Sequence, residues 1–234
     1  MSIHQNAMIE TVGETSPFRW TKVQRLGVFV ISASSIVCLL TEFYGLCPMR
    51  LFTLAVFLPC LLGLTVWSGV DRRLLFPVLF GAGCGLLAAV AYDVFRLPFV
   101  FSSQWGLKGI VPHLKLFNAF PAFGAMILGE PYPRPSYSLT EHLLGWVYHF
   151  SNALTFGIMY VAAVGDPRVR HWMWAVAMAV GLEIGMLATP YTRALGIPLT
   201  ITFIYVTLAA HLIFGVVLGL SSSKSRLLPA LKTV

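Results

Sequence analysis

Six long apolar runs follow one another along this chain of 234 residues, and each is close to the length that crosses a lipid bilayer. A membrane-spanning helix needs about 20 mostly apolar residues, and inside a bilayer only helices and closed barrels satisfy their own backbone groups. The runs predict an all-α, polytopic membrane helix bundle of about six transmembrane helices. Their approximate ranges are Gly27 to Tyr44, Leu51 to Val70, Leu74 to Val100, Leu139 to Gly165, Trp172 to Pro190 and Pro198 to Leu220.

The composition agrees with a membrane protein. Hydrophobic residues make up 57% of the chain and charged residues 11%, whereas about 25% of the residues in a soluble domain are charged. The net charge of +7 could indicate a nucleic-acid partner. However, the lysines and arginines lie between the apolar runs and at the chain ends, without a basic stripe. We therefore expect the lipid bilayer as the partner and no nucleic acid.

The positive charges also predict how the chain is oriented. With the N-terminus inside, ten of the sixteen Lys and Arg residues fall on the inner side and six on the outer side, as the positive-inside rule requires. We expect a cytoplasmic N-terminal tail over residues 1–25, one transmembrane domain over 26–220 and a cytoplasmic C-terminal tail over 221–234. The first apolar run lacks a small-residue cleavage pattern, so we expect no cleaved signal peptide. The four cysteines lack metal-type spacing and are interpreted as packing residues.

A long connection over residues 101–138 separates the third and fourth runs, on the predicted outer side. Connections of this length are usually functional or disordered. The middle of the connection, residues 116–129, is apolar but too short to span a bilayer. It predicts a re-entrant or interfacial segment that caps the outer face of the bundle. A loosely held surface loop is the alternative.

The run from Leu139 to Gly165 carries polar residues at its centre. His142, Gly145, His149 and Asn152 recur at spacings of three and four, so on a helix they share one face. Polar groups at membrane depth face protein or trapped water rather than lipid. The spacing therefore predicts an inward polar face.

Other spans supply ionisable groups that fit such a polar interior. Asp93 and Arg96 lie three residues apart and can form an ion pair on one helical face, although Arg96 could instead extend to the outer headgroups. Glu183 is expected to be protonated, or paired with His149 or Arg96. His211 continues a modest polar stripe on the last span, where an interhelical hydrogen bond is the simplest role. Glu42 lies near the outer end of the first span.

These residues leave three functional hypotheses open. In the first, Asp93, Arg96, His149, Asn152 and Glu183 form a site that handles a small solute, an ion or protons, with Glu42 and His142 as secondary candidates. In the second, His149 and His211 hold haem or a transition metal in a redox protein or enzyme. In the third, the chain is an assembly subunit or homo-oligomer that docks helices through faces of small residues. These faces are Gly81/Gly85, Gly181/Gly185 and Gly215/Gly219.

The C-terminal half, from about Glu141 to Gly219, carries a span with an internal histidine, a following span that ends near a proline, and a last span with a His-Leu pair. The residues concerned are His149, Phe156, Gly157, Tyr160, Pro190, His211 and Leu212. This half resembles uncharacterised bacterial inner-membrane proteins of the YagU type. The resemblance implies a location in the bacterial inner membrane and says little about mechanism.

Overall fold

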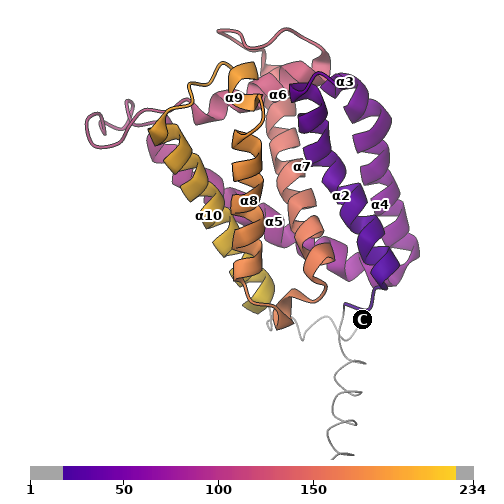
Figure 1. The fold of residues 1–234 in the computed structure, drawn as a ribbon. Coiled ribbons are helices and arrows are strands. Elements are labelled where there is room, and N and C mark those ends of the chain that lie inside the picture. The colour runs from indigo at the N-terminus through magenta and orange to yellow at the C-terminus, as the bar shows by residue number, and fades with distance from the viewer. Residues whose placement is uncertain (1–17, 225–234) are drawn as a thin grey trace, which may run out of the picture.

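The computed structural model describes residues 18–224, which form helices joined by loops, with no strand among them (Figure 1). This confirms the predicted all-α bundle. Of the two predicted tails, residues 22–25 and 221–224 belong to helices, and residues 1–17 and 225–234 lie outside the described part. The elements are α2 (Lys22–Phe43), α3 (Met49–Phe52), η1 (Thr53–Phe57), α4 (Leu58–Val70), α5 (Arg72–Val100), η2 (Leu116–Asn118), α6 (Ala119–Leu128), α7 (Leu139–Val164), η3 (Pro167–Val169), α8 (Met173–Leu187), α9 (Tyr191–Ala194) and α10 (Ile201–Lys224).

Five helices of the described part are long and apolar enough to cross a membrane. They are α2, the continuous helix Met49–Val70, α5, α7 and α10. The remaining predicted span, Trp172 to Pro190, forms the 15-residue α8. At 1.5 Å per residue, α8 covers about 22 Å, which is less than the hydrocarbon core of about 30 Å. It ends at Leu187, before Pro190, because proline disfavours helical backbone in the residue that precedes it.

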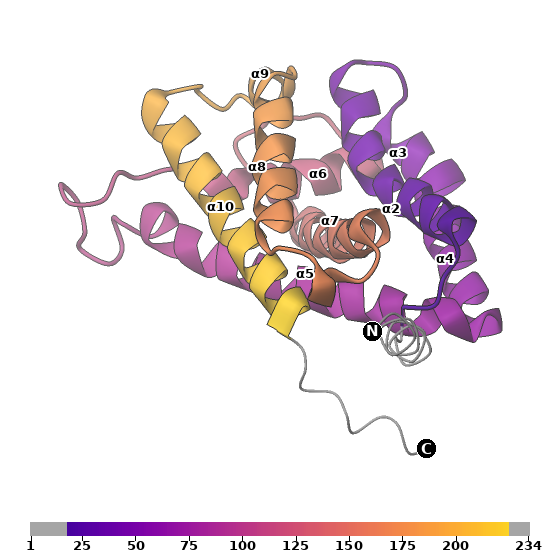
Figure 2. The same cartoon turned by 60° about the horizontal axis from the view of Figure 1, so that its bottom comes forward.

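Successive long helices run in opposite directions between the two ends of the bundle, and α5 crosses the others at a steep tilt (Figures 1 and 2). With α8 included, the chain passes along the bundle six times, so both described chain ends lie at one end. We call this the terminal end. The opposite end carries α3, α6 and α9 and is called the loop end.

Glycines allow the helices at the centre of the bundle to touch through their backbones. A Cβ atom on Gly85 of α5 would lie 2.1 Å from the Ala153 carbonyl oxygen of α7. A Cβ atom on Gly219 of α10 would lie 2.4 Å from the Trp172 carbonyl oxygen at the start of α8. Two of the three small-residue faces are therefore occupied inside the bundle. The third face, Gly181/Gly185, remains open, because a Cβ atom on either glycine would have no neighbour within 4 Å among the described residues.

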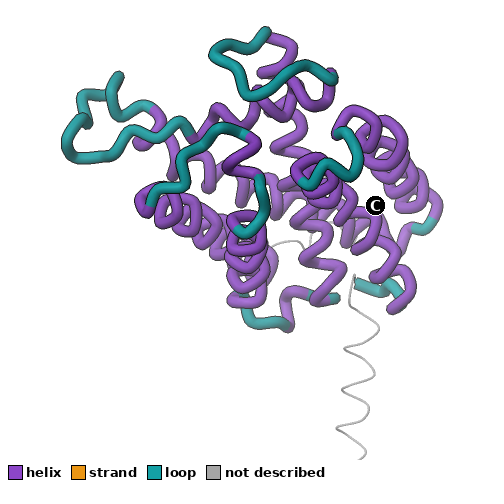
Figure 3. Tube along the Cα trace, turned by 45° about the horizontal axis from the view of Figure 1, so that its top comes forward, coloured by secondary structure: helices purple, strands orange, loops and turns teal. Residues whose placement is uncertain are grey.

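The connection between α5 and α7 spans residues 101–138, as predicted from the sequence. Figure 3 shows it leaving α5 as a loop that extends to one side before it returns to the bundle. Its apolar middle forms η2 and α6, and α6 packs against the first half of α7. The two backbones meet where a Cβ on Gly145 would lie 1.7 Å from the Phe120 carbonyl oxygen. This segment is therefore an ordered part of the loop end.

Glu42 ties the connection over residues 101–138 to the end of α2. One carboxylate oxygen accepts a hydrogen bond from the Tyr132 hydroxyl at 2.5 Å, and the other accepts one from the Met49 backbone N–H. Burial, reinforced by the Glu42 carboxylate, raises the pKa of Tyr132, so its hydroxyl stays protonated as a donor. Glu42 thus has a structural role at the loop end.

Tyr132→Phe removes this hydrogen bond without changing the ring. A hydrogen bond to a charged group contributes about 1.5–3 kcal/mol. We expect proteinase K to cut residues 129–138 of the variant roughly ten-fold faster than the unmodified protein, because the segment opens more often. The exposed Tyr205 offers the matched control: Tyr205→Phe should leave the rate unchanged. Equal rates for both variants would show that the Glu42 contact does not hold the connection.

Candidate functional site

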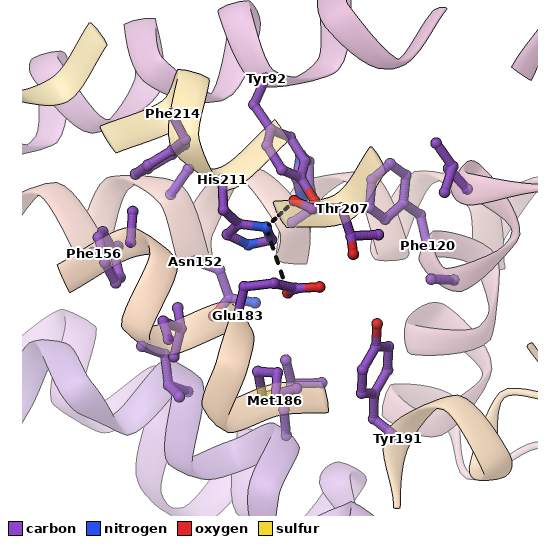
Figure 4. A pocket seen from close by; sticks show the side chains of 18 of the residues that line it. Tyr92, Phe120, Asn152, Phe156, Glu183, Met186, Tyr191, Thr207, His211 and Phe214 are labelled. Carbon is purple, nitrogen blue, oxygen red and sulfur yellow. Dashed lines mark hydrogen bonds and ion pairs between the residues drawn. The ribbon is translucent and has the colours of Figure 1, made fainter. Parts of the chain in front are cut away.

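A cavity of about 190 Å³ lies inside the bundle toward the loop end (Figure 4). Helices α2, α5, α6, α7, α8 and α10 contribute to it, together with Tyr191 of α9. An engineered protein cavity of about 150 Å³ accommodates benzene, so this space matches a solute of a few heavy atoms. Most of the lining is aromatic or aliphatic. The polar lining residues are Tyr92, Arg96, His149, Asn152, Glu183, Tyr191, Thr207 and His211.

On one side, α5 and α7 join Asp93, Arg96 and His149. The Asp93 carboxylate accepts a hydrogen bond from His149 Nε2 at 2.9 Å, and its other oxygen lies 3.4 Å from an Arg96 Nη atom. The second Nη of Arg96 donates to the Leu116 carbonyl at 2.6 Å. The predicted Asp93–Arg96 ion pair is confirmed. Arg96 does not extend to the outer headgroups, because it is 5% exposed and anchored inside the protein.

Aromatic rings enclose the Arg96 guanidinium. Its central carbon lies 4.7 Å from the ring centroid of Tyr92, 5.0 Å from that of Phe117 and 5.3 Å from that of Phe120. A cation over aromatic faces is favourable, and more so when water is excluded. The Asp93 carboxylate and the three rings therefore stabilise the Arg96 charge.

On the other side, α8 and α10 bring Glu183 and His211 together. His211 Nδ1 donates to the Thr207 carbonyl oxygen at 2.9 Å and lies 3.4 Å from a Glu183 carboxylate oxygen. The Glu183 side chain is 4% exposed; the Thr207 side chain lies close to its carboxylate, but the Oε1 atom completes no well-formed hydrogen bond among the described residues. Figure 4 shows the Glu183 carboxylate and the Tyr191 hydroxyl directed into the same space. Glu183 therefore offers an unused acceptor to the cavity.

Tyr92 lies between the two histidines. Its ring centroid is 6.0 Å from that of His149 and 5.0 Å from that of His211. Asn152 lines the same cavity, and within residues 18–224 its side-chain oxygen has no hydrogen-bond partner. The cavity therefore carries two unpaired acceptors, one on Asn152 and one on Glu183.

The structure brings together the main residues selected from the sequence, although two details differ. Glu183 pairs with His211, and the predicted partners His149 and Arg96 are both engaged by Asp93. His142 was predicted to face inward, but it is exposed and contacts the Tyr137 ring. His142 is turned away because α6 covers the side of α7 that carries the buried residues Glu141, Gly145 and Tyr148, and His142 lies off that side.

Sequence reasoning missed the roles of Tyr92, Thr207 and Tyr191. Tyr92 precedes Asp93 and is four residues before Arg96, so its position on the same helical face could have been recognised. Thr207 is visible from the sequence only as part of the His211 stripe. Tyr191 belongs to the short helix α9 beyond α8, and no sequence spacing connects it to the cavity.

The histidines are poorly arranged for metal or haem. Among residues 18–224 there is no group of three or more His, Cys, Asp and Glu side chains placed to hold a metal ion. The Tyr92 ring packs against both imidazoles and lies between them. The donor set therefore does not fit bis-histidine haem ligation.

Comparison with known proteins adds no family to these observations. No protein-family model, curated protein or solved structure matches the chain. The YagU-type resemblance accordingly stays a prediction.

Proposed function

We propose that this chain is a multi-pass membrane protein that handles a small cationic solute or protons in the cavity beside Glu183. The observation that carries the proposal is the unpaired Oε1 of a buried carboxylate in a cavity of small-molecule size. Ionisable residues inside a membrane are costly and generally mark ion or proton pathways. Since Asp93 already compensates Arg96, the carboxylate of Glu183 is the charge left for a ligand.

The groups around Glu183 favour a compact cation with hydrogen-bond donors. Glu183 and Asn152 offer unpaired oxygens, and neither can be satisfied by a ligand that only accepts hydrogen bonds. The lining also includes the aromatic residues Phe156, Phe203 and Phe214, which suit the apolar part of an alkylammonium ion. A proton satisfies the same carboxylate. Protons and cations should therefore compete for Glu183.

We place the protein in a bacterial inner membrane with both termini cytoplasmic. The basis is the excess of Lys and Arg on one side of the predicted spans, together with the YagU-type resemblance. The common position of both described chain ends is compatible with this orientation. The open Gly181/Gly185 face is the candidate contact for a homo-oligomer.

Glu183→Gln tests the function, because it keeps the side-chain shape and removes the charge. Methylammonium should raise the melting temperature of the unmodified protein in detergent, since a ligand that binds only the folded state stabilises it. The effect should weaken as the pH falls, because protons compete for the carboxylate. We expect at least roughly ten-fold weaker methylammonium binding in Glu183→Gln, the loss that accompanies removal of about 1.4 kcal/mol of binding energy.

His142→Gln is the control, since His142 is exposed and does not line the cavity. It should bind methylammonium as the unmodified protein does. Proton flux into proteoliposomes, followed with an internal pH dye, tests the alternative that the site handles protons. If neither methylammonium binding nor proton flux changes in Glu183→Gln, the proposed function is wrong.

A further inference from the structure

A second hollow lies at the terminal end, far along the bundle from the cavity. It is an open groove of about 540 Å³ between the start of α2, the end of α7 and the start of α8. These helix ends are at the bottom of Figure 1 and come forward in Figure 2. The lining combines two arginines, a tyrosine and a tryptophan with small apolar side chains. Its members are Arg25, Tyr160, Ala163, Val164, Arg170, Trp174, Ala177 and Met178.

The two arginines meet at the C-terminus of α7. Arg25 donates to the carbonyls of Ala162 at 2.9 Å and Ala163 at 2.6 Å, and Arg170 Nε donates to that of Val164 at 3.3 Å. These bonds satisfy helix-end carbonyls, which is a structural role. Within residues 18–224, neither guanidinium forms an ion pair with a carboxylate, and the terminal nitrogens of Arg170 have no acceptor. The groove thus keeps positive charge and free donors.

A buried hydroxyl supplies an independent indication of a ligand. Tyr160 lines the groove and is only 1% exposed; the Ser222 side chain lies close to its hydroxyl, but the hydroxyl completes no well-formed hydrogen bond in the described part of the chain. An unsatisfied buried polar group costs about 1–3 kcal/mol. A ligand oxygen in the groove would satisfy it.

The rest of the lining indicates that the ligand is partly apolar. Ala177 and Met178 form an apolar wall beside the arginines. Trp174 is 62% exposed near the start of α8, where tryptophan commonly sits at the membrane–water boundary. A freely soluble anion would contact the arginines but would make no contact with this apolar wall. A phospholipid uses both, with its phosphate at the guanidinium groups and its chains along α8.

We infer that the groove binds an anionic phospholipid, with the lipid phosphate held by Arg25 and Arg170 and in reach of the Tyr160 hydroxyl. Basic pockets between membrane helices bind acidic headgroups in this way. This inference is independent of the function proposed for the cavity. Arg25 and Arg170 would then bind a ligand and also satisfy the carbonyl groups at the end of α7.

Native mass spectrometry of the detergent-purified protein tests the site. The probes are short-chain phosphatidylglycerol, phosphatidylcholine of the same chain length, and inorganic phosphate. We expect phosphatidylglycerol to be retained one per chain and more strongly than phosphatidylcholine. Arg170→Gln should weaken phosphatidylglycerol binding about five-fold, the contribution of one arginine at an anionic membrane surface. Tyr160→Phe should also weaken it.

Arg73→Gln is the matched control, because Arg73 is an exposed arginine at the same end that does not line the groove. It should retain phosphatidylglycerol. Arg170 is exposed and makes one long contact, so its variant is expected to fold; a melting temperature within a few degrees of the unmodified protein checks this. Equal retention of the two lipids, or equal losses in Arg170→Gln and Arg73→Gln, would overturn the site. Binding of inorganic phosphate without a preference for phosphatidylglycerol would overturn the lipid as its ligand.

Discussion

Gly85→Ala should destabilise the folded protein by about 3 kcal/mol or more. The new methyl group would lie 2.1 Å from the Ala153 carbonyl oxygen and 3.1 Å from the Gly157 Cα atom. Overpacking that displaces side chains already costs about 1–3 kcal/mol. Here the obstacles are backbone atoms, so α5 and α7 must separate along their crossing. Thermal unfolding in detergent should show a melting temperature roughly 10 °C lower.

Gly83 provides a control on the same helix. It lies two residues before Gly85, and a methyl group there would have no atom of the described residues within 4 Å. Gly83→Ala gains the same helix propensity as Gly85→Ala, about 1 kcal/mol. It should therefore match or exceed the unmodified protein in stability. Similar melting temperatures for the two variants would show that α5 and α7 do not touch through their backbones at Gly85.

Asp93→Asn should have a comparably large effect for an electrostatic reason. It leaves the buried Arg96 guanidinium without its carboxylate and breaks the charged contact with His149. Removing one partner of a buried ion pair typically costs about 3–5 kcal/mol. We expect low yields of folded protein and a melting temperature at least roughly 10 °C lower. The cavity should lose its order at the same time, because Arg96 also anchors the Leu116 carbonyl.

A double variant separates lost charge balance from lost packing. In Asp93→Asn with Arg96→Met, no unpaired charge remains, and the methionine fills much of the arginine volume. Replacing a buried ion pair by apolar residues is often neutral, so this protein should regain most of the melting temperature. A double variant as unstable as Asp93→Asn alone would mean that the hydrogen bonds of Arg96, and not charge balance, stabilise the site.

The architecture was largely predictable from run length and charge. The connection over residues 101–138 lies where the sequence indicated, between the helix ends at Val100 and Leu139, because polar residues and prolines interrupt the apolar pattern there. The fifth span was harder, since the apolar run continues past Leu187 while α8 stops. Hydropathy measures composition only. Whether an apolar residue extends a helix or begins a turn before Pro190 depends on backbone geometry.

The members of the site were predictable, but their pairing was not. A charged residue inside a predicted span can be recognised as a site candidate because burying a charge in a membrane is costly. Recognising it requires no knowledge of the neighbouring helices. Which side chains pair depends on how each helix is rotated about its axis and where it crosses the next helix. Neither quantity can be derived from the spacing of residues in one sequence. Glu183 was predicted to be protonated, or paired with His149 or Arg96; the structure places it beside His211 and not beside those two residues. Tyr191 could not be assigned. His142 was misplaced because helical periodicity alone could not show where α6 covers α7.

The short α8 changes how far Glu183 is from water. A helix of 15 residues leaves a hydrophobic mismatch with an ordinary bilayer, and membranes relieve mismatch by thinning locally at a modest energetic cost. Glu183 is four residues from the end of α8, about 6 Å along the helix axis. We therefore expect the bilayer surface at the loop end to dip toward the middle of the membrane beside α8. On the proposed function, a thinner bilayer there would bring the aqueous phase closer to the buried Glu183 carboxylate.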